Sequence, residues 1–170
     1  MVNGPGLPQV GSNDNVVPGS GTGTGNTSEG EPMTIDQNKE LVQTFYGLLN
    51  AGRVEAMGDL VIAEYVEHDP LPGQGEGRDG VLDRFSILTS ALAPRFTIDD
   101  VIAEADKVVV RWTNEGTHVG EFAGISATGR SFTVAGIDVY RVEGDRLAEH
   151  WHVIDQLALL GQLGWLPSMA

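Results

Sequence analysis

The stretch SFTVAGIDVYRVEGDRLAEHWHVID, residues 131–155, shows the pattern from which the fold is predicted. Apolar and polar side chains alternate over two runs, 131–142 and 147–154, which are separated by the turn sequence Glu-Gly-Asp-Arg at 143–146. A period of two sends successive side chains to opposite faces of a strand, and a short loop with glycine joins antiparallel strands. The stretch therefore predicts a β-hairpin.

One acidic residue, Asp138, interrupts the apolar row of the first strand of this hairpin. If the hairpin is centred on Asp145, Asp138 lies opposite His152, with their Cβ atoms about 5 Å apart. A carboxylate beside an imidazole is a general acid/base unit, because histidine titrates near neutral pH and the carboxylate fixes its tautomer. We therefore expect Asp138 and His152 to be catalytic.

Two alternatives to this pairing stay open. Asp138 and His152 could form a cross-strand polar pair without chemistry. A register shifted by one residue would oppose Asp138 to Trp151 and turn every side chain to the other face. The chemistry would then pass to Glu149, Trp151 and Asp155, although an Asp just before an apolar helical run also fits a helix N-cap.

Toward the N-terminus, apolar residues repeat at three-to-four spacing, which predicts helices. The first helix begins at Thr34, which forms a capping box with Gln37, and it ends before Gly52. Its apolar face consists of Leu41, Val42, Phe45, Leu48 and Leu49. A second, short helix is expected over residues 54–62.

An extended piece ending at proline, YVEHDP at 65–70, precedes a third helix over about 80–93. The period then changes to two, and strands around 96–102 and over 108–117 form a further hairpin. Residues 155–163 form a short amphipathic helix that closes the open end of the fold or contacts another subunit. Three helices followed by a mostly antiparallel, curved sheet indicate the α+β class, with a cavity between the two layers.

Charge and composition exclude several functions. The chain has 24 acidic and 10 basic residues, a net charge of −14, which would repel nucleic acid and anionic membranes. It contains no cysteine, so disulfides, thiolate catalysis and zinc sites with sulfur ligands are excluded. Because it shows neither a signal peptide nor an apolar stretch near 18 residues, we expect a cytoplasmic protein.

Residues 1–32 differ from the rest of the chain. They hold eight of the 23 glycines and four of the eight prolines, without any Lys or Arg. Such a segment cannot bury enough apolar surface to offset the entropy lost on ordering. We expect a disordered tail over 1–32 and one α+β domain over 33–170.

Three of the four histidines, His68, His150 and His152, occur in segments that this architecture directs at the cavity. His150 and His152 share one strand face, and with His68 or Asp138 they would make a three-ligand metal site. The spacing is loose and no helical His-Glu-x-x-His motif occurs, so we favour acid/base chemistry without a metal or another cofactor.

Aromatic residues would wall a cavity for a planar, apolar substrate, although tryptophan is more often a core residue. The candidate substrate-binding residues are Trp112, Tyr140, His150, Trp151 and Asp155.

The segment GTHVGEFAGISATGRSFTVAGIDVYRVEGDRLAEHWHVIDQLALLGQLG, residues 116–164, resembles the C-terminal half of SnoaL-like polyketide cyclases. YVEHDP resembles their earlier Tyr-x-x-His-x-Pro element, and the resemblance extends over about 33–163. It implies the cone-shaped fold of the nuclear transport factor 2-like superfamily and assembly into dimers or tetramers. In the family, histidine often takes the place of Asp138 and aspartate that of His152, so the two residue types are exchanged here.

The resemblance further implies ring closure by intramolecular aldol condensation, with a carboxylate and a histidine as acid and base and without a cofactor. We expect Asp138 and His152 to share proton abstraction α to a carbonyl of a polyketide-like ester, with His68 binding the enolate oxygen. Alternatives are epoxide hydrolysis, isomerisation of a cyclic ketone, or non-catalytic binding of a small ligand.

Overall fold

The computed structural model describes residues 33–166, so the predicted tail over 1–32 lies outside the described residues. The described residues form four α-helices and a short 3₁₀ turn, η1: α1 (Ile35–Asn50), α2 (Val54–Met57), η1 (Gly58–Leu60), α3 (Gly77–Leu92) and α4 (Gln156–Leu163). The strands are β1 (Val61–Glu67), β2 (Arg95–Glu104), β3 (Lys107–Thr117), β4 (Ser131–Glu143) and β5 (Arg146–Ile154). The predicted α+β class is confirmed.

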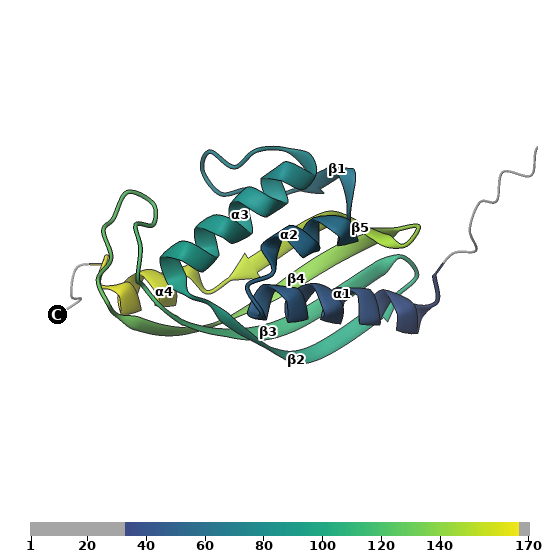
Figure 1. Cartoon of the computed structure of the whole chain (residues 1–170). Coiled ribbons are helices and arrows are strands. Elements are labelled where there is room, and N and C mark those ends of the chain that lie inside the picture. Colours follow the sequence, from purple (N-terminus) through teal and green to yellow (C-terminus); the bar gives the residue numbers. More distant parts are fainter. Residues whose placement is uncertain (1–32, 167–170) are drawn as a thin grey trace, which may run out of the picture.

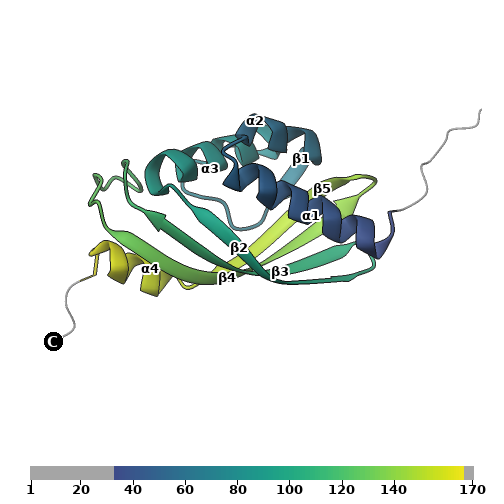
Figure 2. The ribbon, with the colours of Figure 1, turned by 60° about the horizontal axis from the view of Figure 1, so that its bottom comes forward.

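All five strands belong to one curved sheet in the order β1-β5-β4-β3-β2. Only the pairing of β1 with β5 is parallel within this sheet, and the other neighbours are antiparallel. Helices α1, α2 and α3 cover the concave face, as Figures 1 and 2 show. We call the opposite face of the sheet the outer face.

The predicted capping box at the start of α1 is confirmed. The Thr34 hydroxyl accepts a hydrogen bond from the backbone N–H of Gln37 at 3.2 Å, and the Gln37 side chain accepts one from the backbone N–H of Thr34 at 2.8 Å. These bonds satisfy two donors that a helix N-terminus otherwise leaves free. Of the predicted apolar face, Leu41, Val42, Phe45 and Leu49 are buried and Leu48 is half-buried.

The boundaries around β1 differ from the prediction. The second helix, expected over 54–62, ends at Met57, and β1 already begins at Val61. Gly58 lowers helix propensity, and the β-branched residues that follow it favour a strand that pairs with β5. Helix α3 begins at Gly77, three residues earlier than expected, and Asp79 in its first turn suits the positive end of the helix dipole.

The predicted register of the last hairpin is confirmed. Asp138 on β4 lies opposite His152 on β5, and Val139 lies opposite Trp151. Asp138 is on the face that packs against the helices, and Trp151 is on the outer face. The alternative pairing of Asp138 with Trp151 is therefore wrong.

A β-bulge determines this register. Next to the turn, Val142 pairs with Leu147, and continuing that pairing would have set Asp138 opposite Trp151. The register shifts by one residue before the following pair, and buried Ala148 is the additional residue on β5. Beyond the bulge the hairpin is centred on Asp145, as the sequence predicted.

Helix α4 extends the fold beyond the end of β5. The Asp155 carboxylate accepts a hydrogen bond from the backbone N–H of Ala158 at 2.9 Å, which makes Asp155 the N-cap. Farther along α4, the Gln162 side chain bonds both the N–H and the C=O of Thr133 on β4, at 2.8 and 2.9 Å. The helix thus satisfies backbone groups of β4 where β5 no longer can.

Aromatic side chains fill much of the space between the helices and the sheet, where the sequence predicted a cavity. The ring of Phe45 lies 5.5 Å from that of Phe85 and 5.9 Å from that of Tyr140. The ring of Tyr46 lies 6.4 Å from that of Tyr140. None of the helices within residues 33–166 has the length and apolar character needed to cross a bilayer.

Packing of Trp112 against β4 gives a test of this core. A Cβ added at Gly136 would collide with the Trp112 ring, whereas one added at Gly47, on the exposed side of α1, would meet open space. Gly136→Ala should lower the free energy of unfolding by about 1–3 kcal/mol through overpacking. Gly47→Ala should be neutral or stabilise by up to about 1 kcal/mol. Urea denaturation measures both, and an unchanged stability of Gly136→Ala would contradict the packing.

Candidate active site

Three neighbouring strands bring ionisable side chains together on the concave face. Glu67 comes from the end of β1, His150 from β5 and Asp138 from β4. Asp138 is 6% exposed and His150 is 4% exposed, so both are buried below the helices. Because side chains two residues apart share a strand face, His152 lies beside His150. Their rings are stacked, with centroids 5.3 Å apart.

The imidazole of His150 lies between two carboxylates. Its Nδ1 is 2.8 Å from Oε2 of Glu67, and its Nε2 is 3.6 Å from Oδ1 of Asp138. The ring of Tyr140 stacks on it, with centroids 4.6 Å apart. Although Asp138 is opposite His152 in the register, its ionic partner is the diagonal neighbour His150, which corrects the expected direct contact with His152.

Two tyrosine hydroxyls donate hydrogen bonds to the Asp138 carboxylate. The hydroxyl of Tyr46, from α1, donates to Oδ2, and the hydroxyl of Tyr140 donates to the same oxygen at 3.3 Å. The sheet therefore supplies the carboxylate, and a helix supplies part of its hydrogen-bonding environment. Hydrogen bonds to the ionised form favour that form.

Charge pairing outweighs burial in this cluster. Burial alone would lower the pKa of His150, but Asp138 and Glu67 raise that pKa to about 9. Burial alone would raise the pKa of Asp138, but His150 and Tyr46 hold it below its usual value. Burial also opposes ionisation of Glu67, but His150, His152 and Arg84 keep its pKa well below normal. At neutral pH the cluster is an imidazolium between two carboxylates.

Arg84, on α3, connects His152 to the cluster. Its guanidinium donates a hydrogen bond to Nε2 of His152 at 3.4 Å, and it lies 3.7 Å from the Glu67 carboxylate. The backbone N–H of His152 donates to the Asp69 carboxylate at 3.0 Å. Because arginine only donates, Nε2 of His152 is the acceptor, and the ring proton is on Nδ1, 3.8 Å from Glu67 Oε1.

The same residues bear on the metal-site alternative. Ligand atoms of Glu67, His150 and His152 lie within 4.8 Å of one another, so the third member of the group is Glu67 instead of His68 or Asp138. A cation there would meet the guanidinium of Arg84 and would have to displace the proton that His150 shares with Glu67. This charge pattern fits proton chemistry better than metal binding.

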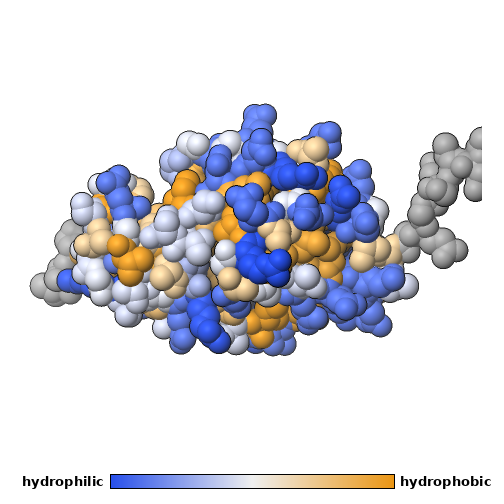
Figure 3. Space-filling view, viewed as in Figure 1, coloured by the Kyte–Doolittle hydropathy of each residue, from blue (hydrophilic) through white to orange (hydrophobic). Residues whose placement is uncertain are grey.

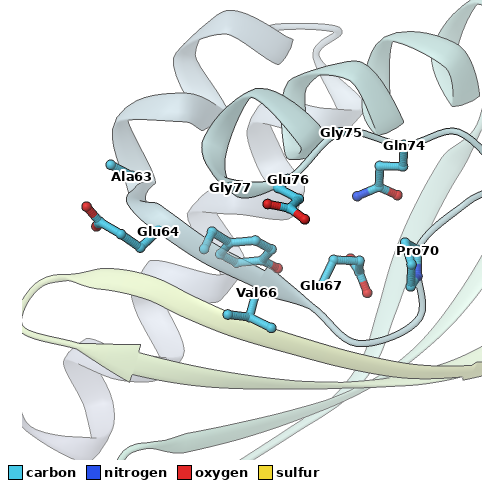
Figure 4. Close-up of a pocket in the computed structure, with 10 residues that line it drawn as sticks. Ala63, Glu64, Val66, Glu67, Pro70, Gln74, Gly75, Glu76 and Gly77 are labelled. Atoms are coloured by element: carbon cyan, nitrogen blue, oxygen red, sulfur yellow. The ribbon is translucent and has the colours of Figure 1, made fainter.

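A cavity of about 760 Å³ lies beside the cluster, between β1 and the loop that leads into α3. Figure 4 shows Glu67, Gln74 and Glu76 around it. Gln74 also accepts a hydrogen bond from Arg84 at 3.2 Å, so this wall is continuous with the charged cluster. Glu67 therefore belongs to both the cavity wall and the cluster.

Two predicted site residues lie on the outer face instead. His68 stacks on Trp151 with ring centroids 4.2 Å apart, and its Nε2 is 2.8 Å from the Glu149 carboxylate. The Nζ atom of Lys107 lies 4.9 Å from the centre of the Trp151 ring. The expectation that His68 and Trp151 face the cavity is not met, because alternation along the strands turns both away from Glu67 and His150.

The other predicted substrate-binding residues have different positions. Trp112 and Tyr140 are buried in the core around Asp138. Asp155 caps α4, away from the cluster. Sequence reasoning missed Glu67, Tyr46 and Arg84. Glu67 adjoins His68 in the segment YVEHDP, and the alternation of β1 was the available signal, but the strand was expected to begin four residues later.

Comparisons with known proteins agree with this architecture. Residues 39–163 match the sequence profile of the SnoaL-like polyketide cyclases. TsrD from Streptomyces laurentii has a similar structure, with 32% identity over 79% of this chain and 99% of its own, and a TM-score of 0.72. Among proteins with curated descriptions, none matches this sequence significantly.

Two further solved structures are similar. IdmH from Streptomyces antibioticus, a candidate polyketide cyclase, is 28% identical over 75% of this chain and 99% of its own, with a TM-score of 0.66. AclR from Streptomyces galilaeus, a candidate hydroxylase, is 24% identical over 79% of this chain and 100% of its own, with a TM-score of 0.69. At that identity the likeness to AclR concerns the fold alone.

Protonation of His150 should make stability depend on pH. Its pKa is about 9 in the folded protein and 6.5 as a free side chain, so the stabilisation is full below about pH 6.5 and is lost as pH rises through 9. We expect the free energy of unfolding to fall by roughly 1–3 kcal/mol over this interval. Urea denaturation of wild type and His150→Gln at several pH values measures it. Equal pH slopes for the two proteins would contradict the assignment.

Proposed function

The chain belongs to the SnoaL-like polyketide cyclase family, and from this premise we propose that it closes a ring in a polyketide-like ester by intramolecular aldol condensation. The observation that carries the proposal is the buried carboxylate–imidazolium–carboxylate cluster beside a cavity. Such a cluster holds a proton acceptor and a proton donor within one site, and perturbed ionisable groups next to a cavity favour catalysis.

The proposed reaction moves one proton and forms one bond. A base removes the proton from a carbon α to a carbonyl, and the enolate carbon attacks a second carbonyl of the same molecule. A carbon–carbon bond forms, and the oxygen of the attacked carbonyl takes up a proton. The ring product contains the same atoms as the substrate, so the step needs only an acid and a base at fixed positions.

Asp138 is the proposed base. Its carboxylate is ionised at neutral pH and is fixed by Tyr46, Tyr140 and His150. The His150 imidazolium is the proposed acid, because a proton held between Asp138 and Glu67 can be delivered and then restored. A base and an acid positioned in advance each contribute typically 10²–10⁴-fold to a rate.

His152 shares the acid/base work in this proposal without contacting Asp138. It lies beside His150 on the same strand face, and Arg84 and Asp69 fix its position. Its imidazole is more exposed than that of His150, with 17% against 5% of the side chain accessible. His152 can therefore exchange protons with ligand or solvent while His150 stays buried.

The lining of the cavity supports an ester over a free acid as substrate. Three glutamates, Glu64, Glu67 and Glu76, belong to its wall. A carboxylate substrate would meet like charges there, in a protein whose net charge is already −14. An uncharged ester avoids this repulsion.

Substitutions in the cluster test the proposed chemistry. Asp138→Asn and His150→Gln should each lower turnover at least 100-fold, because each removes a proton acceptor or donor. The substrate is a linear aromatic β-keto ester that carries a second ketone within reach of its enolate carbon. His152→Ala should cause a comparable loss. Product analysis by mass spectrometry in ¹⁸O-labelled water measures turnover, and ring closure should leave the label out of the product.

His68→Ala is the comparison variant, since His68 lies on the outer face against Trp151. It should keep its turnover within about threefold of wild type. Near-normal rates in both Asp138→Asn and His150→Gln would end the assignment. Incorporation of labelled oxygen would instead indicate hydrolysis.

We also propose that the outer face of the sheet pairs with a second copy of the chain, as the family resemblance implies. Ile137 and Val153 lie opposite each other in the register and are 45% and 75% exposed, which makes an apolar area on this face. On the face that carries the helices, hydrophilic side chains are interspersed with several apolar areas (Figure 3). Exposed apolar area of this kind is typical of interaction surfaces.

A charge on this surface should separate the copies. Val153→Glu should shift the sedimentation coefficient from that of a dimer or tetramer to that of a monomer, because a buried unpaired carboxylate is costly. Ile87→Glu, an equivalent change at an exposed position of α3, should leave the assembly intact. A monomeric wild type, or an assembly unaffected by Val153→Glu, would refute this interface.

A further inference from the structure

Three buried tyrosines surround the cluster, and one differs from the other two. The hydroxyls of Tyr46 and Tyr140 both donate to Asp138. Tyr65, on β1, is only 4% exposed, yet its hydroxyl makes no hydrogen bond with any residue that the structure describes. Among residues 33–166 the Tyr65 oxygen is not one of the fully enclosed polar atoms without a partner, so the hydroxyl is free to bond a ligand.

Tyr65 lies beside both the cavity and the charged cluster. Tyr65 lines the cavity beside β1, and Glu67, two residues farther along, lies on the same strand face. The charges of Glu67, Arg84 and Asp138 all affect the ionisation of its phenol, which places the hydroxyl in their neighbourhood. The ring therefore adjoins the space where a substrate can enter and the groups that move protons.

We propose that the Tyr65 hydroxyl donates a hydrogen bond to the carbonyl oxygen of a ligand in this cavity and keeps it as that oxygen becomes an enolate. The inference rests on the proposed enolate chemistry and gives Tyr65 the role that the sequence assigned to His68. Tyr65 transfers no proton in this step, because the phenol keeps its proton while negative charge develops on the substrate oxygen.

The chemistry of the site suits a neutral donor. Burial, with the negative charges of Glu67 and Asp138, raises the pKa of the Tyr65 phenol well above its ordinary value, so the hydroxyl stays protonated. A fixed donor aimed at developing charge contributes typically 10²–10³-fold to a rate. Arg84, the nearby cation, is already engaged with Gln74 and His152. Unlike Arg84, Tyr65 is therefore an uncommitted donor beside the cavity.

Infrared difference spectroscopy tests the hydrogen bond directly. The probe is ethyl benzoylacetate with a carbon-13 label at its ketone, because a hydrogen bond to a carbonyl lowers its stretching frequency. Bound to wild type, the labelled band should move to lower frequency. In Tyr65→Phe the probe should bind within about threefold of wild type, and the band should return toward its unbonded position.

Tyr140→Phe is the matched control, since it removes a hydroxyl that already donates to Asp138. It should keep the shifted band. In steady-state assays, Tyr65→Phe should lower kcat about 100-fold with KM changed less than threefold, the pattern of a contact that strengthens in the transition state. A purely structural role of Tyr65 would leave the band at the same frequency in Tyr65→Phe and in the wild type.

Deuterium incorporation α to the ketone, measured on the same proteins, separates the two proposals. Suppose that deuterium exchange requires Asp138 but the band has the same frequency in Tyr65→Phe as in the wild type. Another donor or a water then bonds the substrate oxygen, so the role of Tyr65 is refuted while the proposed reaction is not. If the shift depends on Tyr65 but wild type catalyses no exchange, the contact stands and the proposed reaction fails. A wild type that does not bind the probe, or binds it without a shift, overturns the inference.

Discussion

The position of His150 between Asp138 and Glu67 is the interaction on which the rest of the site depends. Each of the three residues is contributed by a different strand, and the order β1-β5-β4 puts the imidazole in the middle. A buried charge without a partner would be strongly destabilising, so each member of the trio requires the others. The fold can bury these charges only because it brings together segments more than 60 residues apart in the chain.

Two local features of the backbone make that arrangement possible. The bulge at Ala148 sets the register that brings Asp138 to the face shared by His150 and His152. The parallel strand β1 then adds Glu67 from the other side of β5. A shift of one residue in either strand would send these side chains to the outer face, because side-chain direction alternates along a strand.

The features that could be predicted from the sequence are those that depend on residues close together in the chain. Period and turn chemistry were sufficient for the helix that starts at Thr34 and for the last hairpin. They left two registers open for Asp138, opposite His152 or opposite Trp151, and the bulge at Ala148 selects the first. Short-range patterns could not predict which side chains complete the site around Asp138. Which imidazole reaches Asp138 depends on diagonal contacts in a twisted sheet, and the role of Glu67 instead of His68 depends on where β1 begins. Tyr46 reaches the site from a distant helix, and only tertiary packing determines such a contact.

The protonation state of His150 at neutral pH is the most direct test of the charged cluster of Glu67, His150 and Asp138. In ¹⁵N-resolved NMR spectra, assigned by comparison with His150→Gln, both ring nitrogens of His150 should carry protons at neutral pH and lose one only near pH 9. The Nδ1 proton should show the downfield shift of a hydrogen bond to a carboxylate. A neutral imidazole at that pH would contradict the account, because Asp138 and Glu67 would then be buried carboxylates without the shared cation that holds them together.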